Sequence, residues 1–268
     1  MKGMVVIMKI IFIRKKYLIL PLLLLFFLFF TVFSILNFPK SFAVELSKNS
    51  IFSDEALEKV SNLTKGTEKV AFMTFDDGPN VSVTPKVLDI LKDEDVKASF
   101  FVIGKNVDAN PQIVKRAYDE GHFIANHGYD HNNAILYKSN ESFINEIKKT
   151  DLAIGNAIGV QDYCSHVFRF PNGFMSPNNK ARKKEAVKLL KDMNYTYIDW
   201  NCLNNDSVKK YNNYQLLNNL KKTCKNKDTL VILMHDTKDV SNSSNVLKES
   251  IQYLKSEGYT FKNFYDVL

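Results

Sequence analysis

Two adjacent carboxylates follow an apolar run in the first third of the chain. Residues 70–73 predict a buried strand, and Gly78-Pro79 ends it as a turn would. Asp76 and Asp77 are therefore expected at the carboxyl end of a strand, where two unpaired buried carboxylates are costly. A bound cation would relieve that cost, with one Asp as its ligand and the other free to move a proton. Asp-Gly is also common in plain turns, so this stretch alone leaves both interpretations open.

Two histidines offer a matching pair of ligands. His127 and His131 are four residues apart, so one helical turn would aim both imidazoles at one point. Two neutral imidazoles and one carboxylate form a common ligand set for a catalytic zinc ion. The same spacing is also found in pairs of surface histidines. Asp130, which lies between them, is interpreted as solvent-facing or capping.

Alternating strand and helix patterns from Glu68 onward provide the frame for these residues. Strands are predicted at 70–75, 98–103, 122–126, 166–170, 195–200, 229–234 and 259–264. Helices are predicted at 85–92, 111–120, 140–158, 181–193, 214–224 and 246–257. About seven β-α units predict a parallel sheet with helices outside, either doubly wound or a barrel. The sequence contains no GxGxxG motif, which disfavours a nucleotide-binding version.

Polar residues recur where the predicted strands end. In a β/α barrel, catalytic side chains gather at the carboxyl ends of the strands. Five of the predicted ends carry such residues: Asp76-Asp77, 127–131, 169–173, 199–201 and His235-Asp236. This recurrence favours one shared site over five unrelated turns.

These segments resemble the five motifs of the polysaccharide deacetylase family, the carbohydrate esterases (family 4) that share the NodB homology domain. The resemblance covers about residues 68–268. Its motifs read here as Thr74-Phe75-Asp76-Asp77-Gly78-Pro79, His127-Gly128-Tyr129-Asp130-His131, Arg169-Phe170-Pro171-Asn172-Gly173, Asp199-Trp200-Asn201 through Asp206, and Leu233-Met234-His235. The implied fold class is α/β, a distorted (β/α)7 barrel of the NodB homology type.

The resemblance also implies a division of roles. Asp77, His127 and His131 would hold a divalent metal ion, usually Zn²⁺. Asp76 would be the general base and His235 the general acid. Such an ion lowers the pKa of bound water towards about 7, and an amine leaves readily only after it is protonated.

Five further positions would support the reaction. Arg169 would orient and charge-balance the general base, and Asp206 would tune the general acid. The backbone N–H of Asn172 would help to form the oxyanion hole. Leu233 and Trp200 would wall the pocket for the acetyl methyl group.

Three positions depart from the usual family pattern. Gly128 replaces the Ser or Thr that commonly follows the first metal-binding histidine. Asn172 stands where an aromatic residue is frequent, and Ser207 stands where Trp is frequent. All the metal-binding and proton-transfer positions are filled, so we expect an active enzyme.

The N-terminus has the composition of a membrane anchor. Residues 17–38 are almost wholly apolar and uncharged, about the length of a membrane span. The basic residues before them predict a cytoplasmic N-terminus and an exported remainder. A signal peptide cleaved near Ser41-Phe42-Ala43 is the alternative. The expected organisation is a basic segment (1–16), a transmembrane anchor (17–38), a linker with a short helix (39–67) and a deacetylase domain (68–268).

Charge and cysteine content narrow the remaining possibilities. Five of the 36 basic residues precede the apolar run, and the other 31 nearly balance 29 acidic residues. We therefore expect no nucleic-acid partner. Cys164, Cys202 and Cys224 form no CxxC pair, which argues against a zinc knuckle. Burial as small apolar residues is expected for them; one extracellular disulfide is possible, and the sequence does not identify the pair.

Together these features predict a membrane-anchored, metal-dependent N-deacetylase with its catalytic domain outside the cell. The expected partner is cell-wall polysaccharide, with N-acetylglucosamine of peptidoglycan as the substrate. One alternative is a deacetylase of another N-acetylhexosamine polymer or of O-acetyl xylan. Another is a barrel that binds glycan without turnover.

Overall fold

The computed structural model describes residues 52–208, 210–237 and 243–268. The predicted basic segment, the predicted membrane anchor at 17–38 and residues 39–51 of the predicted linker lie outside these residues. Within the described ranges, no helix combines the length and the apolar character that crossing a membrane requires.

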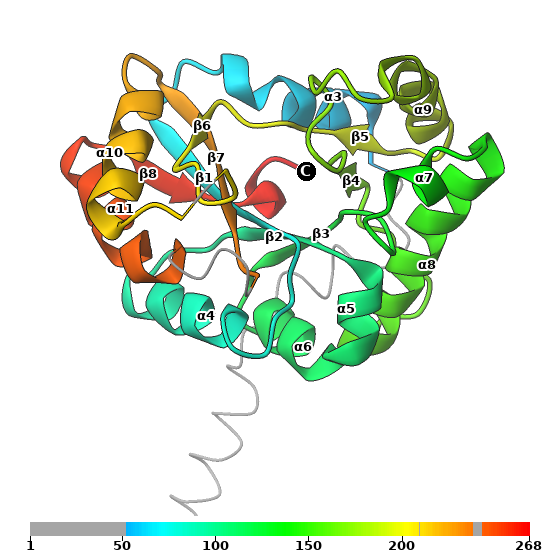
Figure 1. The fold of residues 1–268 in the computed structure, drawn as a ribbon, viewed down its shortest axis with the longest axis horizontal. Helices are drawn as coiled ribbons and strands as arrows, with labels where there is room; N and C mark the ends of the chain where they lie inside the picture. Colours follow the sequence, from blue (N-terminus) through cyan, green and yellow to red (C-terminus); the bar gives the residue numbers. More distant parts are fainter. Residues whose placement is uncertain (1–51, 209, 238–242) are drawn as a thin grey trace, which may run out of the picture. The chain divides into compact units, whose positions relative to one another are not determined.

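A sheet of eight parallel strands forms the centre of the described domain (Figure 1). Its strands are β1 (Val70–Asp76), β2 (Ser99–Val102), β3 (Phe123–Asn126), β4 (Val167–Phe168), β5 (Thr196–Tyr197), β6 (Cys202–Leu203), β7 (Thr229–His235) and β8 (Thr260–Lys262). The hydrogen-bonded order is β5-β4-β3-β2-β1-β7-β6, and β8 pairs with the first residues of β1.

The sheet is curled, because its two outermost strands are close in the chain. β5 and β6 lie at opposite ends of the hydrogen-bonded order, yet only residues 198–201 connect them. Four extended residues span only about 14 Å. The Ile198 N–H donates to Phe168 O on one side, and the Asn201 N–H donates to Val231 O on the other. The predicted barrel-like α/β class is therefore confirmed in its coarse form, with a short connecting segment bridging the two edges.

Helices cover the outer face of the sheet (Figure 1). They are α4 (Thr84–Asp93), α5 (Gly104–Ala109), α6 (Pro111–Asp119), α7 (Asn133–Leu136), α8 (Asn140–Ile158), α9 (Lys180–Asp192), α10 (Asn213–Cys224) and α11 (Ser243–Ser256). Local signals define their ends. The Ser139 side chain accepts the Ser142 N–H at the start of α8, and Gly159 ends that helix with a φ of 75°.

Alternation along the strands separates an outer core from an inner one. On β1, Ala71, Met73 and Phe75 pack in the outer core with helix residues. Val70 and Phe72 pack in the inner core, together with residues of β2, β3, β7 and the C-terminal turn. Successive side chains of a strand point to opposite faces. The remaining even-numbered residues of β1, which include Asp76, therefore point towards the interior of the curl.

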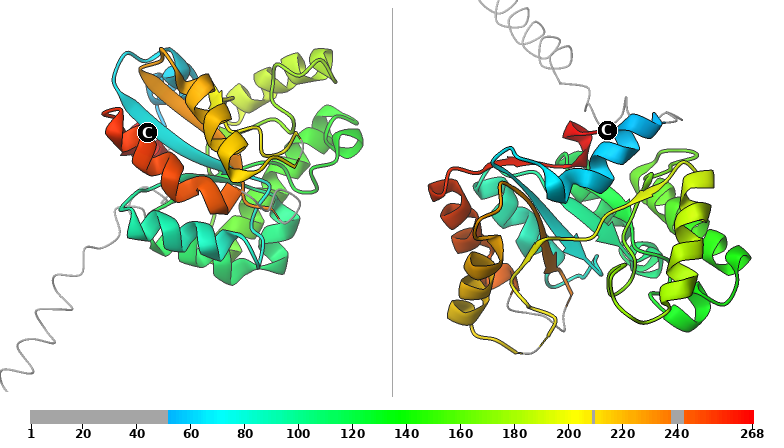
Figure 2. Two further views of the ribbon diagram at one scale, coloured as in Figure 1. Left: turned by 60° about the vertical axis from the view of Figure 1, so that its left-hand side comes forward. Right: turned by 90° about the horizontal axis from the view of Figure 1, so that it is seen from above.

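The amino end of this interior is covered by two helical segments. Val60 of α3 (Asp54–Asn62) and Phe264 of η3 (Phe264–Asp266) are fully buried in the inner core. Figure 2 shows α3 and the C-terminal turn at the same end of the sheet. η1 (Leu63–Lys65) continues from α3 and contacts β7. Residues 54–65 of the predicted linker therefore pack against the domain, and the short helix expected in the linker is present as α3.

The predicted strands and helices between residues 70 and 264 are present, with ends that differ by a few residues. The main difference lies at 195–200, where a single strand was expected. Instead, two short strands form: β5 pairs with β4 and ends at Tyr197, and β6 begins at Cys202 and pairs with β7. One run of residues thus contributes to both edges of the sheet. The short helices α5 and α7 were not expected.

Candidate active site

The strand register brings the first proposed catalytic residues together. Asp76 is paired with His235 on the neighbouring strand β7, and Asp76 is also paired with Phe101 on β2. Residues paired in parallel strands present their side chains on the same face of a sheet. Asp76 and His235 therefore both project into the carboxyl end of the curl.

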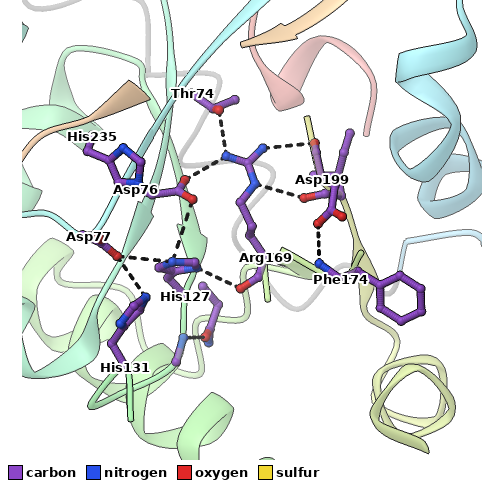
Figure 3. A network of polar contacts seen from close by, with 12 residues as sticks. Thr74, Asp76, Asp77, His127, His131, Arg169, Phe174, Asp199 and His235 are labelled. Carbon is purple, nitrogen blue, oxygen red and sulfur yellow. Dashed lines mark hydrogen bonds and ion pairs between the residues drawn. The ribbon is translucent and has the colours of Figure 1, made fainter. Parts of the chain in front are cut away.

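Arg169 is the buried centre of the site (Figure 3). Its Nη1 atom lies 2.8 Å from Asp76 Oδ1 and donates to Thr74 Oγ1 at 2.7 Å. Its Nε atom donates to Ile198 O at 3.0 Å, and its Cζ lies 3.9 Å from the centre of the Phe101 ring. The side chain is fully buried. A buried guanidinium needs a charged partner and hydrogen-bond acceptors, and these contacts supply both while fixing the Asp76 carboxylate.

Asp77, His127 and His131 form a cluster beside this ion pair (Figure 3). Asp77 Oδ1 lies 3.3 Å from His127 Nε2 and 3.2 Å from His131 Nε2. Burial favours a raised pKa for Asp77, but the two imidazoles outweigh it and hold the pKa of this carboxyl below its usual range. Asp77 is thereby kept as an anion.

The hydrogen bond made by one ring nitrogen of His127 leaves the other nitrogen available to bind a metal ion. Its Nδ1 atom lies 2.8 Å from the Arg169 carbonyl oxygen, which can only accept a hydrogen bond. Nδ1 therefore carries a proton, and in the neutral ring that a metal ligand requires the lone pair of Nε2 points at Asp77. Asp77 Oδ1 is buried and has no hydrogen-bond partner among the described residues. Lone pairs that converge without a proton between them suit a divalent cation, so the residues present fit the metal that the sequence predicts.

The two histidines lie on a loop, so the expected helical turn between them is wrong. Gly128 has a φ of 83° and His131 a φ of 52°. Asn126 Oδ1 accepts the Gly128 N–H at 3.0 Å. Glu146 Oε2, from α8, accepts the N–H groups of the next two residues at 3.0 Å each. Glu146 was not singled out from the sequence, because one Glu in an amphipathic helix carries no motif.

His235 and Asp206 form a second charged pair of the site, next to Asp76. Asp206 Oδ1 lies 2.7 Å from His235 Nδ1, and Asp206 Oδ2 accepts the His235 N–H at 2.8 Å. Ser243 also donates to Asp206 Oδ2. Burial would lower the pKa of His235, but the carboxylate of Asp206, with those of Asp76 and Asp77, raises it to about 9. The imidazole is therefore cationic at neutral pH, as a general acid must be.

The three predicted pocket residues lie within or shortly after strands of the site. Leu233 is buried on β7, two residues before His235. Asn172 is exposed in a left-handed conformation with a φ of 64°. The ring of Trp200 lies against Gly173, where an added Cβ would come within 2.8 Å of Cη2. The ring centre of Trp200 is also 5.7 Å from the Arg169 guanidinium.

The cysteines differ in part from expectation. Cys202 of β6 and Cys224 at the end of α10 form a disulfide, so they are not the free apolar thiols that the sequence suggested. Cys164 is free and half-buried. Burial raises the pKa of its thiol to about 12, which leaves it protonated and unreactive at neutral pH.

A curled parallel α/β sheet with an Asp-His-His cluster beside a buried carboxylate and a cationic imidazole is the arrangement expected of a metal-assisted hydrolase. The family model for polysaccharide deacetylases matches residues 64–198. The peptidoglycan-N-acetylglucosamine deacetylase PgdA of Listeria monocytogenes is 35% identical over 204 residues, which cover 76% of this chain and 40% of that protein. A peptidoglycan-N-acetylglucosamine deacetylase of Bacillus cereus is 34% identical and is matched over 74% of this chain and 70% of its own length.

The fold comparison agrees with the sequence comparison. The structure of a CE4 esterase from Streptococcus mutans superposes with a TM-score of 0.68 at 28% identity, covering 81% of this chain and 93% of that one. This chain belongs to the polysaccharide deacetylase family. It spans about 40% of the length of the Listeria relatives that it matches.

Proposed function

We propose that this protein is a metal-dependent hydrolase of acetamide groups on N-acetylated cell-wall polysaccharide, with peptidoglycan N-acetylglucosamine as its substrate and acetate as a product. One observation carries the proposal: a three-residue ligand cluster lies beside a carboxylate held by a buried arginine and an imidazole held by a buried aspartate. A glycan-binding barrel without turnover would not need both proton-transfer groups to be held in this way.

Asp77, His127 and His131 would hold the ion, and two imidazoles with one carboxylate favour Zn²⁺. When bound, such an ion supplies Lewis-acid chemistry, polarising a carbonyl oxygen and making water more acidic. His127 is oriented for this task by the Arg169 carbonyl oxygen that accepts its Nδ1 proton.

Asp76 would act as general base. Its Oδ1 is engaged by Arg169, whereas its Oδ2 lies 3.8 Å from His127 Nε2 and so faces the ligand cluster. Oδ2 would take a proton from the water that adds to the acetamide carbonyl carbon. Arg169 stabilises the carboxylate between turnovers, because its buried positive charge has no other carboxylate partner among the described residues.

His235 would act as general acid on the leaving group. It would donate its proton to the amide nitrogen as the carbon–nitrogen bond breaks, which releases acetate and an amino sugar. The pKa of about 9 keeps this proton on the ring at neutral pH. The Asn172 N–H would donate to the oxygen that becomes negative during the addition, and Leu233 and Trp200 would contact the acetyl methyl group.

The substrate and the location rest on wider observations. The relatives named above are peptidoglycan-N-acetylglucosamine deacetylases, which favours the same sugar over another N-acetylhexosamine polymer or O-acetyl xylan. The Cys202–Cys224 disulfide suits an oxidising compartment. The apolar segment at 17–38 follows basic residues. Together, the disulfide and this segment support a single-pass anchor with an extracellular catalytic domain, or secretion after signal cleavage. Protease digestion of intact cells tests this location: cleavage of the domain supports it, and full protection contradicts it.

Acetate release is the direct test of the activity. The full chain, purified in detergent micelles, is incubated with peptidoglycan glycan fragments, with N-acetylglucosamine oligomers and with acetylated xylan. We expect acetate from the first substrate together with an equal amount of new primary amine. Release from xylan alone, without new amine, would identify an O-deacetylase. Equal rates for wild type and Asp76→Asn would support the binding barrel.

A further inference from the structure

The loop between β4 and α9 contains the Asn172 N–H, a backbone donor that no hydrogen bond within the loop fixes in place. Asn172 and Gly173 both have positive φ values, 64° and 78°. Asn is one of the few non-glycine residues that adopt left-handed backbone, so the turn is compatible with its sequence. The one backbone bond within the turn joins the Gly173 N–H to Phe170 O at 2.7 Å. Within the described part of the chain, the Asn172 N–H has no hydrogen-bond partner.

Asp199 braces this loop from the side of the sheet (Figure 3). Its Oδ1 accepts the Phe174 N–H at 2.9 Å, and its Oδ2 accepts the Met175 N–H at 3.3 Å. Its backbone oxygen lies 3.4 Å from Arg169 Nη2. One residue therefore links the loop to the guanidinium that orients Asp76.

Lys183 braces the same loop from the side of α9. Its Nζ atom donates to Gly173 O at 2.6 Å and to Ser176 O at 3.3 Å. The residue is 2% exposed, whereas its neighbours Arg182 and Lys184 are exposed. Burial lowers the pKa of the Lys183 ammonium, and the charge of Asp199 opposes that shift. An ammonium withdrawn from water and directed at two loop carbonyls is costly, which indicates a specific task at this position.

The loop also rests on an aromatic surface. An added Cβ at Gly173 would lie 2.8 Å from Trp200 Cη2, so only glycine allows this close contact. Phe174 packs against Tyr197 with ring centres 4.8 Å apart. Gly173 and Phe174, which directly follow Asn172, are thus held against aromatic rings, while among the described residues the exposed Asn172 side chain contributes no hydrogen bond to the turn.

We propose that Lys183 and Asp199 are positioning residues that clamp the loop over residues 170–176 and so fix the Asn172 N–H where negative charge develops on the substrate oxygen. This inference rests on the proposed deacetylase function. Removing one oxyanion donor outright costs about 10²–10³ in kcat. Loosening the loop displaces the donor without deleting it, so a smaller loss is expected.

Two conservative variants, Lys183→Met and Asp199→Asn, test the clamp. Lys184→Met is the matched control, because its side chain is exposed one residue further along α9. Amide hydrogen exchange over residues 170–176 and steady-state kinetics are measured on the full chain. In both variants we expect faster exchange at Phe174 and Met175 and a kcat that is lower by about tenfold or more, with KM within about twofold. The control should match wild type.

Each outcome decides part of the inference. Unchanged exchange in both variants overturns the clamp, and faster exchange with unchanged kcat overturns its link to the reaction. A raised KM at unchanged kcat also overturns that link, because it indicates substrate binding instead. If Lys183→Met does not fold, as judged by circular dichroism, Asp199→Asn alone decides. A wild-type protein that releases no acetate contradicts the proposed function, while exchange still tests the clamp.

Discussion

The individual residues of the site act in charge-matched pairs. Asp76 is paired with Arg169 at 2.8 Å, and His235 with Asp206 at 2.7 Å. Each pair joins a group proposed to move a proton to a buried partner that holds its charge state and orientation. The consequences of removing a partner therefore differ from those of removing the reacting group itself.

Asp206→Asn is expected to shift the alkaline limit of activity. His235 must be protonated to act as an acid, so kcat/KM should fall as pH rises through its pKa, about 9. Without the Asp206 carboxylate, burial is opposed only by the smaller effects of Asp76 and Asp77, so the pKa falls and the limit moves to lower pH by about one unit or more. The pH profile of kcat/KM measures the shift. Asp119→Asn, which changes an exposed carboxylate on α6, is the control, and an unmoved limit in Asp206→Asn would rule out this role.

Asp76→Asn is expected to separate proton transfer from metal binding. The substitution keeps the side-chain shape but removes the base, so kcat should fall by about 10²–10⁴. Metal content should remain, since Asp77 and not Asp76 lies within 3.3 Å of both imidazoles. Acetate release and metal analysis on the same sample provide the measurement. Asp77→Ala should lose both, and a metal-free Asp76→Asn would show that the ligand set has been assigned incorrectly.

Two elements meet at the loop that carries the metal-binding histidines. β3 supplies Asn126, whose amide donates to Ile147 O of α8, and α8 supplies Glu146. Family members commonly have a hydroxyl residue where this chain has Gly128. In this chain Glu146 stabilises the loop from α8. A Cβ added at Gly128 would lie 3.9 Å from Glu146 Oε2, so this carboxylate is close to the position of the missing side chain.

Glu146→Ala should therefore weaken metal binding although the residue is not a ligand. The Tyr129 and Asp130 N–H groups would lose their acceptor, and His131 would be held less firmly. Loss of such outer contacts typically costs 10–100-fold in metal affinity, and Zn²⁺ titration measures it. Glu141→Ala, an exposed change on the same helix, should have no effect. Equal affinities of both variants would assign Glu146 a purely structural role.

At the scale of the whole molecule, the interior of the curl has two differently filled ends. The carboxyl end contains the ionisable site, and the amino end is closed by Val60 of α3 and Phe264 of η3. A domain that began at residue 67 would leave that inner core open to water. The segment before β1 is therefore part of the folding unit.

A chain that starts at residue 67 should be less stable than one that starts at residue 52. Leu57 and Val60 are both buried, and burial of each such side chain contributes about 1.5–3 kcal/mol. The free energy of unfolding should fall by about 3 kcal/mol or more, as measured by urea denaturation. Equal midpoints for the two chains would mean that α3 is only loosely associated with the domain.

The sequence by itself determined most of the strands and the longer helices, and the chemical types at the strand ends. Alternating and helical apolar patterns depend on neighbours in the chain, so β1 and α8 could be placed from local residues. The residues of the ligand cluster and of the proton-transfer pair were all predicted from motifs. Their roles rest on the resemblance and await the experiments above.

Only the tertiary structure decided which distant side chains support that site. Glu146 reaches the histidine loop, Ser243 reaches Asp206, and Lys183 reaches the turn after Arg169. These contacts depend on how each helix packs across the curled sheet. A polar residue on a helix face gives no local sign of the loop that it will meet.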